Sequence, residues 1–389
     1  MNPMAYVLDP TATDQLSAVR GVGRYMQTLH DSFGAFHTEQ LDTATSLHNA
    51  VFSFTNDYHA VPPDAVLINP FFNIFQKPLK FSRLARRQIT VIHDVIPLKY
   101  KKSFPVGLKG TVFKYINKWL LKYSDLIVTD SEASKKDIMF YLNIPEKKIL
   151  IIYPTIPKVF LPHLDTHPES IEHHHPFHKE VDHSVPEYSE LPNRAAGVEH
   201  IIGPIKDYIL YVGDASWNKN LPVLAQAIQK VNIPLVCVGN IFANREEILK
   251  KKPHPWQLSL FSFLKMTYNN PLFIFPGFVP DIDLMLLYKH ARMNVLPSLD
   301  EGFGLPYIEA GYMSTPSVLA DIPVFHEIAH NAAIFANPHD PASLSQKISE
   351  LYFDNVRQEK MSIEVFDRAQ QFDPARFTQG WISAVQSVI

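Results

Sequence analysis

The chain has 389 residues, of which 46% are hydrophobic and 19% charged, a composition typical of soluble proteins with sizeable cores and a length that favours two domains. A formal net charge of −3 excludes a strong general attraction to nucleic acid, and the single cysteine, Cys237, excludes a disulfide within the chain. The N-terminus lacks a basic segment followed by an apolar one, and no run approaches the about 20 apolar residues that span a bilayer, so we expect a cytoplasmic protein.

Short apolar runs alternate with longer helical patterns along the chain, which predicts parallel sheets covered by helices. The first part has strand candidates at residues 65–70, 89–97, 125–131 and 148–154. The second part has them at residues 208–214, 234–239, 272–278, 293–298, 316–321 and 332–338, with helical patterns at 221–231, 281–291 and 343–372. We therefore expect an α/β fold with two doubly wound units. Cys237 lies in one of the apolar runs and is expected to be a buried, reduced thiol.

The predicted domains are a Rossmann-like domain at residues 1–160, an insert at 161–206, a second Rossmann-like domain at 207–365 and a helical segment at 366–389 that returns to the first domain. The insert is rich in His, Pro and Glu and shows no apolar period, which is typical of a linker or flap between domains. Its histidines raise the possibility of a metal site, but their irregular spacing and the many prolines favour a solvated loop.

The region from residue 77 to residue 123 is strongly basic, and Asp94 is its only acidic residue. A helix predicted at 108–123 has an apolar face formed by Val112, Ile116, Trp119, Leu120 and Tyr123. Lysines occupy the rest of this helix, at Lys109, Lys114, Lys118 and Lys122. Two interpretations stay open, namely a surface helix that packs its apolar face on its own sheet, and an interfacial helix attracted to anionic lipid.

Two glutamates, Glu301 and Glu309, flank a Gly-Phe-Gly turn between the strand candidate at 293–298 and a predicted helix. Ligands of open α/β sheets bind beyond the carboxyl ends of the strands, where such turns lie. Gly302 and Gly304 allow the backbone to approach an anion, and the amides at the helix start face it. Two acids beside an anion site fit a ligand that carries hydroxyls as well as phosphates, such as a nucleotide sugar.

The stretch from residue 297 to residue 348 resembles the signature of the retaining glycosyltransferases of family 4, which have the GT-B fold and whose mark is two glutamates separated by seven residues with Gly-Phe-Gly-Leu between them. The resemblance implies that Glu301 contacts hydroxyls of the transferred sugar and that Glu309 holds the ribose. It also implies that the backbone of Gly302, Phe303, Gly304 and Leu305 lies around the sugar and the diphosphate.

Two further stretches of the second half resemble this family. In "YILYVGDASWNKNLPVLAQAI" the resemblance implies that Lys219 neutralises the diphosphate, whereas a lysine at such a junction is otherwise a solvated surface charge. "GFVPDIDLMLLYKHA" is similar to the segment that lines the base pocket, here through Phe278 and Val279. The second domain would therefore bind the nucleotide sugar.

The first half resembles the acceptor domain of the family. "RGVGRYMQTL" is similar to its Gly-rich turn, which implies that Gly21 and Gly23 face the diphosphate, although a lone G-x-G is more often an ordinary turn. "VIHDVIPL" implies that His93 reaches the donor sugar, although a lone histidine after a strand is more often structural. Ser131 is a candidate N-cap in "TDSEASKKDI".

The resemblance covers residues 19–160 and 206–385, with two departures. The insert is longer than the usual crossover, and the arginine often found in the loop after residue 213 is absent. Arg20 or Arg24 could supply that charge from the opposite domain. The missing arginine keeps one alternative open, a non-catalytic GT-B scaffold that binds a nucleotide sugar or a protein partner, and epimerases and phosphorylases also share the fold.

The resemblance implies a retaining transfer of a hexosyl unit from a nucleoside diphosphate sugar to an acceptor hydroxyl, in the synthesis of a bacterial surface polysaccharide or glycolipid. GDP-mannose is the expected donor, because "HDVIPL" and "SEASKKDI" are similar to mannosyltransferases. We expect no cofactor and no metal site, since no convincing Asp-x-Asp metal motif lies in a loop at a strand end. The expected partners are the nucleotide-sugar donor, a glycan or lipid-linked acceptor, and an anionic membrane at whose inner face the protein would act. Nucleic acid is not an expected partner.

Overall fold

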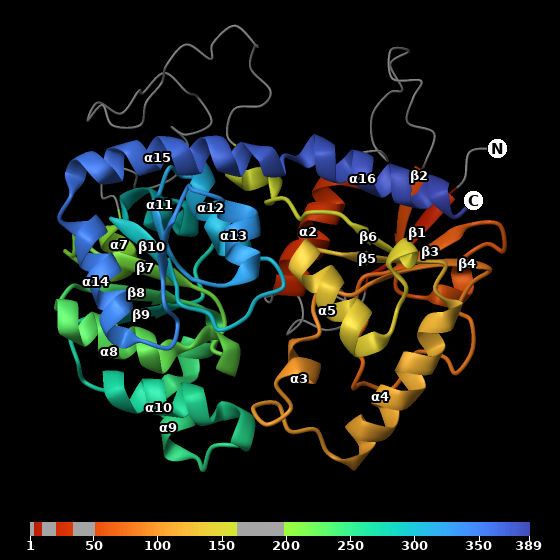
Figure 1. Cartoon of the computed structure of the whole chain (residues 1–389), viewed down its shortest axis with the longest axis horizontal. Coiled ribbons are helices and arrows are strands. Elements are labelled where there is room, and N and C mark those ends of the chain that lie inside the picture. Colours follow the sequence, from red (N-terminus) through yellow and green to blue (C-terminus); the bar gives the residue numbers. More distant parts are fainter. Residues whose placement is uncertain (1–3, 10–20, 34–50, 162–197) are drawn as a thin grey trace, which may run out of the picture.

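The computed structural model describes residues 4–9, 21–33, 51–161 and 198–389, which form two parallel β-sheets that lie side by side (Figure 1). The first sheet has the strand order β2-β1-β3-β4-β5-β6. Its strands are β1 (Met4–Leu8), β2 (Val51–Thr55), β3 (Val66–Asn69), β4 (Arg87–Val91), β5 (Leu126–Thr129) and β6 (Ile149–Ile151). All of its strand pairs are parallel.

The second sheet has the order β12-β11-β10-β7-β8-β9, and its pairs are also parallel. Its strands are β7 (Ile209–Val212), β8 (Leu235–Val238), β9 (Phe273–Gly277), β10 (Met293–Leu296), β11 (Ser317–Ala320) and β12 (Ile334–Ala336). Every residue of β8, β10 and β11 is buried. Continuous apolar runs form such strands because helices cover both faces of a parallel sheet.

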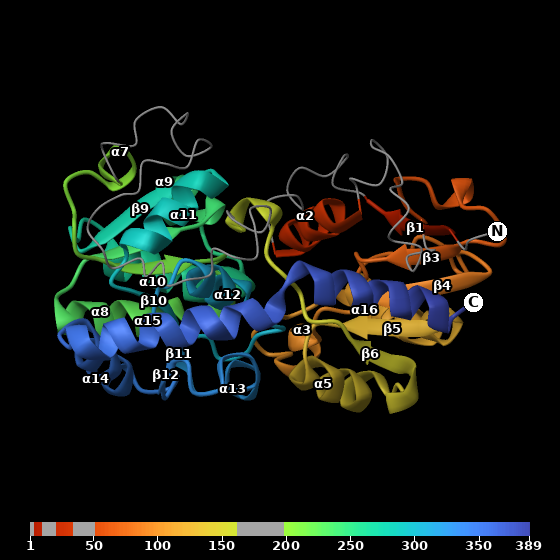
Figure 2. The same cartoon turned by 90° about the horizontal axis from the view of Figure 1, so that it is seen from above.

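Helices surround both sheets (Figures 1 and 2). Those of the first half are α2 (Gly21–Phe33), α3 (Ile96–Lys99), α4 (Leu108–Leu120) and α5 (Glu132–Leu142). Those of the second half are α7 (Glu199–Ile202), α8 (Leu221–Val231), α9 (Arg245–Lys250), α10 (Leu258–Thr267), α11 (Asp281–His290), α12 (Leu305–Tyr312), α13 (Pro323–Ala329) and α14 (Pro341–Tyr352). The two doubly wound units predicted from the sequence are confirmed. Cys237 is fully buried and free.

Two long C-terminal helices, α15 (Asn355–Ala369) and α16 (Pro374–Ser387), run end to end across both halves (Figures 1 and 2). α16 contributes Trp381, which is fully buried, to the core of the first sheet. The strand β1 and the last helix, α16, therefore share one core.

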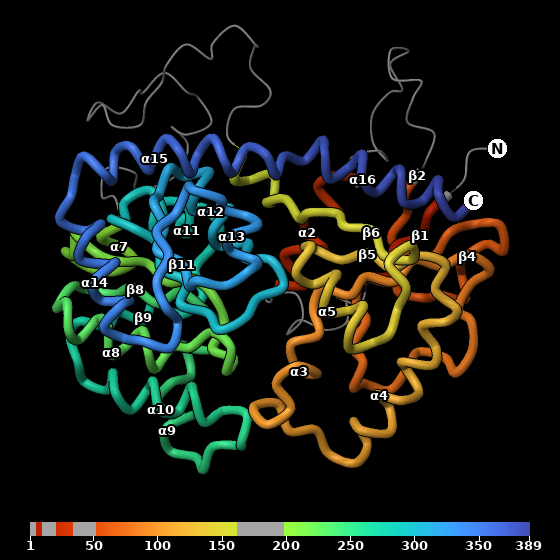
Figure 3. Tube along the Cα trace, in the orientation of Figure 1, coloured from red at the N-terminus to blue at the C-terminus, as the bar shows by residue number. Residues whose placement is uncertain are grey.

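In the described residues the chain passes from the first core to the second between Ile152 and Ile156, and returns between Phe372 and Phe377. The two passages are joined directly, because the Thr155 hydroxyl donates a hydrogen bond of 2.6 Å to the Phe372 carbonyl. Figure 3 shows the yellow and blue segments running together there. The boundary expected after residue 160 thus follows the first passage, and the one expected after residue 365 lies inside α15. The domain limits stay a prediction. Most of the expected insert lies outside the described residues.

Two details of the structure differ from the sequence expectations. β1 and β2 were not among the predicted strands. The helical pattern at 343–372 is divided in two because the Asp354 carboxylate accepts a 2.9 Å hydrogen bond from the Arg357 amide and so caps a new helix, α15.

The basic helix α4 is present, but its apolar face does not pack on its own sheet as one interpretation required. Val112 is 55% exposed and Trp119 is 53% exposed. The buried position is Asn117, whose amide donates hydrogen bonds of 2.9 and 2.8 Å to the carbonyls of Ile74 and Gln76. Across the described part of the chain, no helix combines the length and the apolar character that a membrane crossing requires.

Candidate active site

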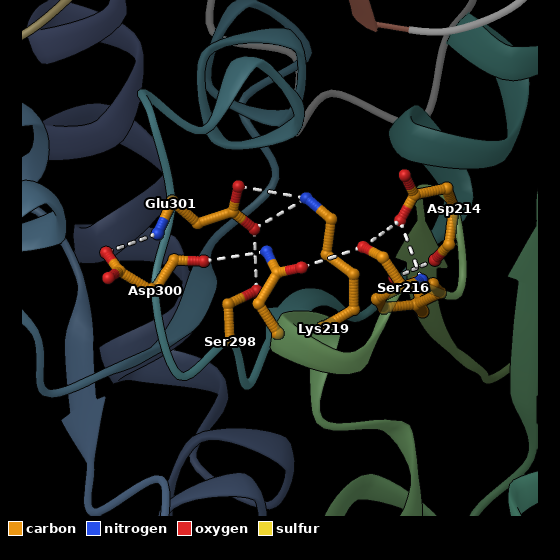
Figure 4. Close-up of polar contacts among 8 residues, drawn as sticks. Asp214, Ser216, Lys219, Ser298, Asp300 and Glu301 are labelled. Atoms are coloured by element: carbon orange, nitrogen blue, oxygen red, sulfur yellow. Dashed lines mark hydrogen bonds and ion pairs between the residues drawn. The ribbon is translucent and has the colours of Figure 1, made fainter. Parts of the chain in front are cut away.

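Glu301 and Lys219 form an ion pair in two loops that follow neighbouring strands (Figure 4). β7 and β10 are hydrogen-bonded parallel neighbours, so the loops at their carboxyl ends meet. Lys219 Nζ lies 2.7 and 2.9 Å from the two Glu301 carboxylate oxygens, and the Ser298 hydroxyl donates a 2.6 Å hydrogen bond to the same carboxylate. Burial alone would lower the pKa of Lys219, but the adjacent carboxylate raises it above its ordinary value, so the ammonium stays charged.

Asp300 anchors the same loop to the other half of the molecule. Lys99, at the end of α3, places its Nζ 2.8 Å from Asp300 Oδ2 and 3.1 Å from Asp137 Oδ2. The Asn218 amide donates to the Asp300 carbonyl at 2.9 Å, and the Asp300 carboxylate accepts from the Glu301 amide at 3.0 Å. The loop that carries Glu301 is therefore held by Asn218 from its own half and by Lys99 from the other half.

The Gly-Phe-Gly turn lies between the two halves. The Gly302 carbonyl accepts hydrogen bonds from the hydroxyls of Ser131 (2.7 Å) and Ser134 (3.1 Å), which lie at the start of α5, and Ser131 is the N-cap predicted there. A Cβ at Gly302 would lie 3.0 Å from the His93 carbonyl oxygen, so His93 directly adjoins this turn. Phe303 is 5% exposed and packs against Phe372 with 5.5 Å between ring centroids. The turn holds the halves together as well as shaping the site.

Gly304 requires glycine for two reasons. Its φ is +110°, a value that side chains other than glycine rarely adopt, and a Cβ would lie 2.8 Å from Phe325 Cε1. Leu305, which begins α12, is partly buried against the second core. The amides of this helix start are therefore positioned by a backbone that no other residue tolerates well.

Glu309 is 3% exposed and is bound by a residue of the opposite half. Arg24 Nε lies 3.2 Å from Glu309 Oε1, while Arg24 Nη1 lies 2.6 Å from Asp281 Oδ1. The Tyr288 hydroxyl donates a 2.9 Å hydrogen bond to Glu309 Oε2. Burial raises the pKa of Glu309, and the guanidinium and the hydroxyl oppose that rise.

His93 follows β4, and both of its ring nitrogens have acceptors. Nδ1 lies 2.7 Å from Asp130 Oδ2, and Nε2 lies 3.2 Å from the Pro70 carbonyl oxygen. A carbonyl only accepts, so Nε2 carries a proton, and the carboxylate favours a second proton on Nδ1. Burial alone lowers the pKa of His93, but Asp130 raises it, which favours the imidazolium.

Asp94 lies beside His93 and is the acid nearest to the Gly-Phe-Gly turn from the first half. Its side chain is reached by solvent, yet many protein atoms surround it, and this partial desolvation raises its pKa to about 6. A Cβ at Gly302 would lie 3.3 Å from Asp94 Cβ. The sequence analysis counted Asp94 only as the one acid of a basic region.

The remaining predicted residues lie in different environments. Phe278 is 60% exposed, whereas the Val279 side chain is 7% exposed and belongs to the second core, so only its backbone could face a ligand. Gly21 and Gly23 were expected in a Gly-rich turn, but they lie in the first turn of the helix α2. Arg20 lies outside the described residues.

The sequence reasoning missed several contacts of this site. It left Arg24 as one of two possible anion ligands, and the structure instead pairs it with Glu309 and Asp281. It did not single out Tyr288 or Lys99. A tyrosine and an arginine far from the glutamates in sequence carry no pattern that links them, so only the folded arrangement reveals these pairs.

Among the described residues, no group of three or more His, Cys, Asp and Glu side chains is placed to hold a metal ion. The histidine-rich stretch at 162–197 is not among them, so the expectation that no metal is needed stays a prediction.

The family described as "Glycosyl transferases group 1" matches residues 199–366, the part that carries Lys219, Glu301 and Glu309. The second half of the chain is thus similar to a group 1 glycosyltransferase domain. The family resemblance inferred from the sequence is thereby confirmed.

Curated proteins similar to this chain include two that are named for the O-antigen chain. O-antigen chain mannosyltransferase RfbU of Salmonella typhimurium is 27% identical over 277 residues, which cover 69% of this chain and 62% of that protein. O-antigen chain mannosyltransferase B of Escherichia coli is 30% identical over 183 residues, which cover 46% of this chain and 45% of that protein. The chain thus covers less than two thirds of the length of either relative.

Two solved structures align with almost the whole chain. The structure of HepE from Anabaena in complex with UDP and glucose has a TM-score of 0.63 at 13% identity and covers 99% of this chain and 100% of that one. Sucrose-phosphate synthase from Thermosynechococcus elongatus has a TM-score of 0.66 at 14% identity, with coverages of 100% and 99%. At this level of identity the likeness concerns the fold, and the predicted GT-B fold is confirmed.

Proposed function

We propose that the protein is a retaining glycosyltransferase that moves a hexosyl unit, with mannose expected, from a nucleoside diphosphate sugar to an acceptor hydroxyl. The observation that carries the proposal is the Lys219–Glu301 pair at the carboxyl ends of β7 and β10, with His93 beside it from the other half. The relatives named as O-antigen mannosyltransferases support a role in surface polysaccharide synthesis.

The ion pair defines how the site would respond to a donor. A diphosphate carries more charge than the Glu301 carboxylate, so a bound donor would attract Lys219 away from it. The freed carboxylate could then accept hydrogen bonds from sugar hydroxyls. Lys219 and the amides that follow Gly304 would stabilise the charge that grows on the departing diphosphate. These groups would act without a metal or a cofactor.

Glu309 would exchange partners in the same way. Ribose hydroxyls would replace part of its contact with Arg24, whose guanidinium would then be free to approach the diphosphate. This exchange would supply, from the opposite half, the positive charge that the loop after residue 213 lacks. The imidazolium of His93 would lie where the sugar loses its leaving group.

A donor survey tests this function. Purified protein is incubated with GDP-mannose, UDP-glucose and UDP-galactose, and release of nucleoside diphosphate is measured with and without a soluble α-mannoside acceptor. We expect turnover with one donor, abolished in Lys219→Ala, and NMR of the product should show the anomeric configuration of the donor. Tight binding without any turnover would instead favour a non-catalytic scaffold.

We also propose peripheral contact with an anionic membrane, at its inner face, through α4. Leu108 is 88% exposed and Tyr115 is 65% exposed on this helix. An apolar hollow of about 430 Å³ is lined by Phe81, Tyr115, Ile116 and Trp119. Three lysines lie on the same helix, at Lys109, Lys114 and Lys118, and Lys122 follows in the turn η4 (Leu121–Tyr123). Each is worth about 1 kcal/mol near such a surface.

Vesicle co-sedimentation tests the membrane contact. We expect binding to vesicles with anionic lipid that weakens as salt rises, and that falls when the four lysines become glutamate. Replacement of four lysines of the second half, at Lys230, Lys265, Lys289 and Lys360, should leave binding much less affected. Equal affinity for neutral and anionic vesicles would favour a soluble acceptor.

A further inference from the structure

A second hollow, of about 440 Å³, is lined by residues that follow α3 and by residues at the start of α10. Figure 1 shows the chain after α3 approaching the second half in this region. The volume of this hollow falls within the about 300–1,000 Å³ of small-molecule sites. Residues of both halves line it, among them Lys102 and Ser103 from the first half and Trp217, Trp256 and Ser259 from the second. None of the roles proposed above uses this hollow.

Two indoles dominate its walls. Trp217 is fixed by aromatic neighbours, since its ring centroid lies 5.0 Å from that of Tyr100 and 6.2 Å from that of Phe104. Trp256 stands 50% exposed beside His254. A half-exposed tryptophan in a hollow is a large apolar surface with one polar N–H, which suits a partner that is apolar on one face and polar at its edge.

The rim supplies unused polar groups. Within the described part of the chain, the side chains of Lys102, Ser103 and Ser259 make no hydrogen bond or ion pair to another side chain or to the backbone. The two serine hydroxyls and the lysine ammonium suit hydrogen bonds with the equatorial hydroxyls of a pyranose. The indole beside them suits the apolar C–H face of the same sugar. Sugars combine these two properties, whereas an aliphatic ligand would leave the polar rim unused.

The hollow adjoins the proposed catalytic pair. Trp217 begins the turn η8 (Trp217–Lys219), which ends in the lysine of the pair, and Leu299, which also lines the hollow, precedes Asp300 and Glu301. The two loops are joined by a 2.7 Å hydrogen bond from the Leu299 amide to the Asn218 carbonyl. A glycan that enters the site could therefore extend one of its units into the hollow.

We infer that this hollow is a subsite for a pyranose unit of the glycan acceptor, with Trp256 stacked on the sugar and Lys102 and Ser259 bonded to its hydroxyls. The inference rests on the proposed function, because only a glycosyltransferase would use the bound glycan as an acceptor. Binding of a pyranose to the hollow can be measured without any turnover.

The binding experiment uses the full chain labelled with 5-fluorotryptophan, whose four signals from Trp119, Trp217, Trp256 and Trp381 are assigned by single Trp→Phe variants. Titration with soluble α-mannopentaose should shift the signals of Trp217 and Trp256 and leave that of Trp119, which lies on α4, unchanged. Absence of any shift at Trp217 and Trp256, or an equal shift of all four signals, would overturn the subsite. This result does not depend on whether the protein is active.

The kinetic experiment uses Trp256→Ala, with Trp119→Ala as the matched control because both indoles are about half exposed. With α-mannopentaose as acceptor, we expect Trp256→Ala to raise the acceptor KM about tenfold, a value typical of one lost aromatic contact. Donor hydrolysis without acceptor should be unchanged, and Trp119→Ala should behave as the parent. An unchanged acceptor KM in Trp256→Ala would overturn the proposed subsite without contradicting the proposed transferase activity. Absence of donor turnover in the parent would refute the transferase activity, and the titration alone would then decide whether the subsite exists.

Discussion

Replacing Arg24 by methionine removes the cation that neutralises Glu309 across the two halves. Glu309 is 4% exposed at its side chain and Arg24 is 19% exposed, so water screens this pair little. Removing one partner of a buried ion pair costs about 3–5 kcal/mol, because a charge is left buried without compensation. We expect the lower end, about 3 kcal/mol, since the Tyr288 hydroxyl still donates to the carboxylate and the carboxylate can take up a proton.

The loss should depend on pH with a defined sign. Burial raises the pKa of Glu309 above that of an unfolded glutamate, and without the guanidinium it rises further. A carboxyl whose pKa is higher when folded loses stability as pH rises from the unfolded pKa through the folded one. The deficit of Arg24→Met against the parent should therefore be largest near pH 7.5 and shrink toward pH 5, where the carboxyl is closer to neutral.

Urea unfolding at several pH values measures this deficit. Lys347→Met is the matched control, because it removes a surface lysine 2.9 Å from Glu350 and should cost about 0–1 kcal/mol. Arg24→Met combined with Glu309→Gln should recover most of the loss, since the amide oxygen still accepts from Tyr288. A deficit equal to that of Lys347→Met, or one that does not change between pH 5 and pH 7.5, would refute the reasoning.

Three further predictions concern the donor site. Glu301→Ala should lower turnover more than donor affinity, whereas Glu309→Ala should mainly weaken nucleotide binding, each by about ten- to hundredfold. Steady-state kinetics measures the turnover and calorimetry measures the binding. Small, equal changes of both quantities in both variants would contradict the assignment. Activity in excess EDTA should equal activity in Mg²⁺, and a loss restored by Mn²⁺ would point to a metal site. Gly304→Ala should destabilise the fold by about 1–3 kcal/mol, because of the positive φ and the close Phe325 ring, whereas Gly21→Ala, where a Cβ meets nothing within 4 Å, should be tolerated in the same urea assay.

The sequence was sufficient for features that rest on local patterns. Apolar runs bounded by turn residues predicted the ten strands from β3 to β12, and the expected N-cap Ser131 begins α5. β1 and β2 were missed because each is a five-residue run with few apolar neighbours to mark it. The helical pattern at 343–372 was not divided, since Asp354 looks like any polar residue until its carboxylate is seen to cap α15.

Contacts between the halves could not be predicted, because they join residues far apart in sequence. Nothing near Arg24 indicates that it meets Glu309, and nothing near Lys99 indicates that it meets Asp300. The same limit explains Val279, whose apolar side chain fits a base pocket and a core equally well. The exposed face of α4 was likewise ambiguous, since an apolar stripe has the same period whether protein or lipid covers it.

The hydrogen bond from Thr155 to Phe372 has a mechanical consequence. Both segments that connect the halves meet at this bond, so it marks the position of a hinge about which the halves could rotate. The other contacts between the halves, such as Arg24 with Glu309 and Lys99 with Asp300, must break when the halves move apart. Substrate entry is therefore coupled to the ion pair and the turn that would hold the donor. The strength of these contacts between the halves, and not the connecting segments, would set the rate of opening.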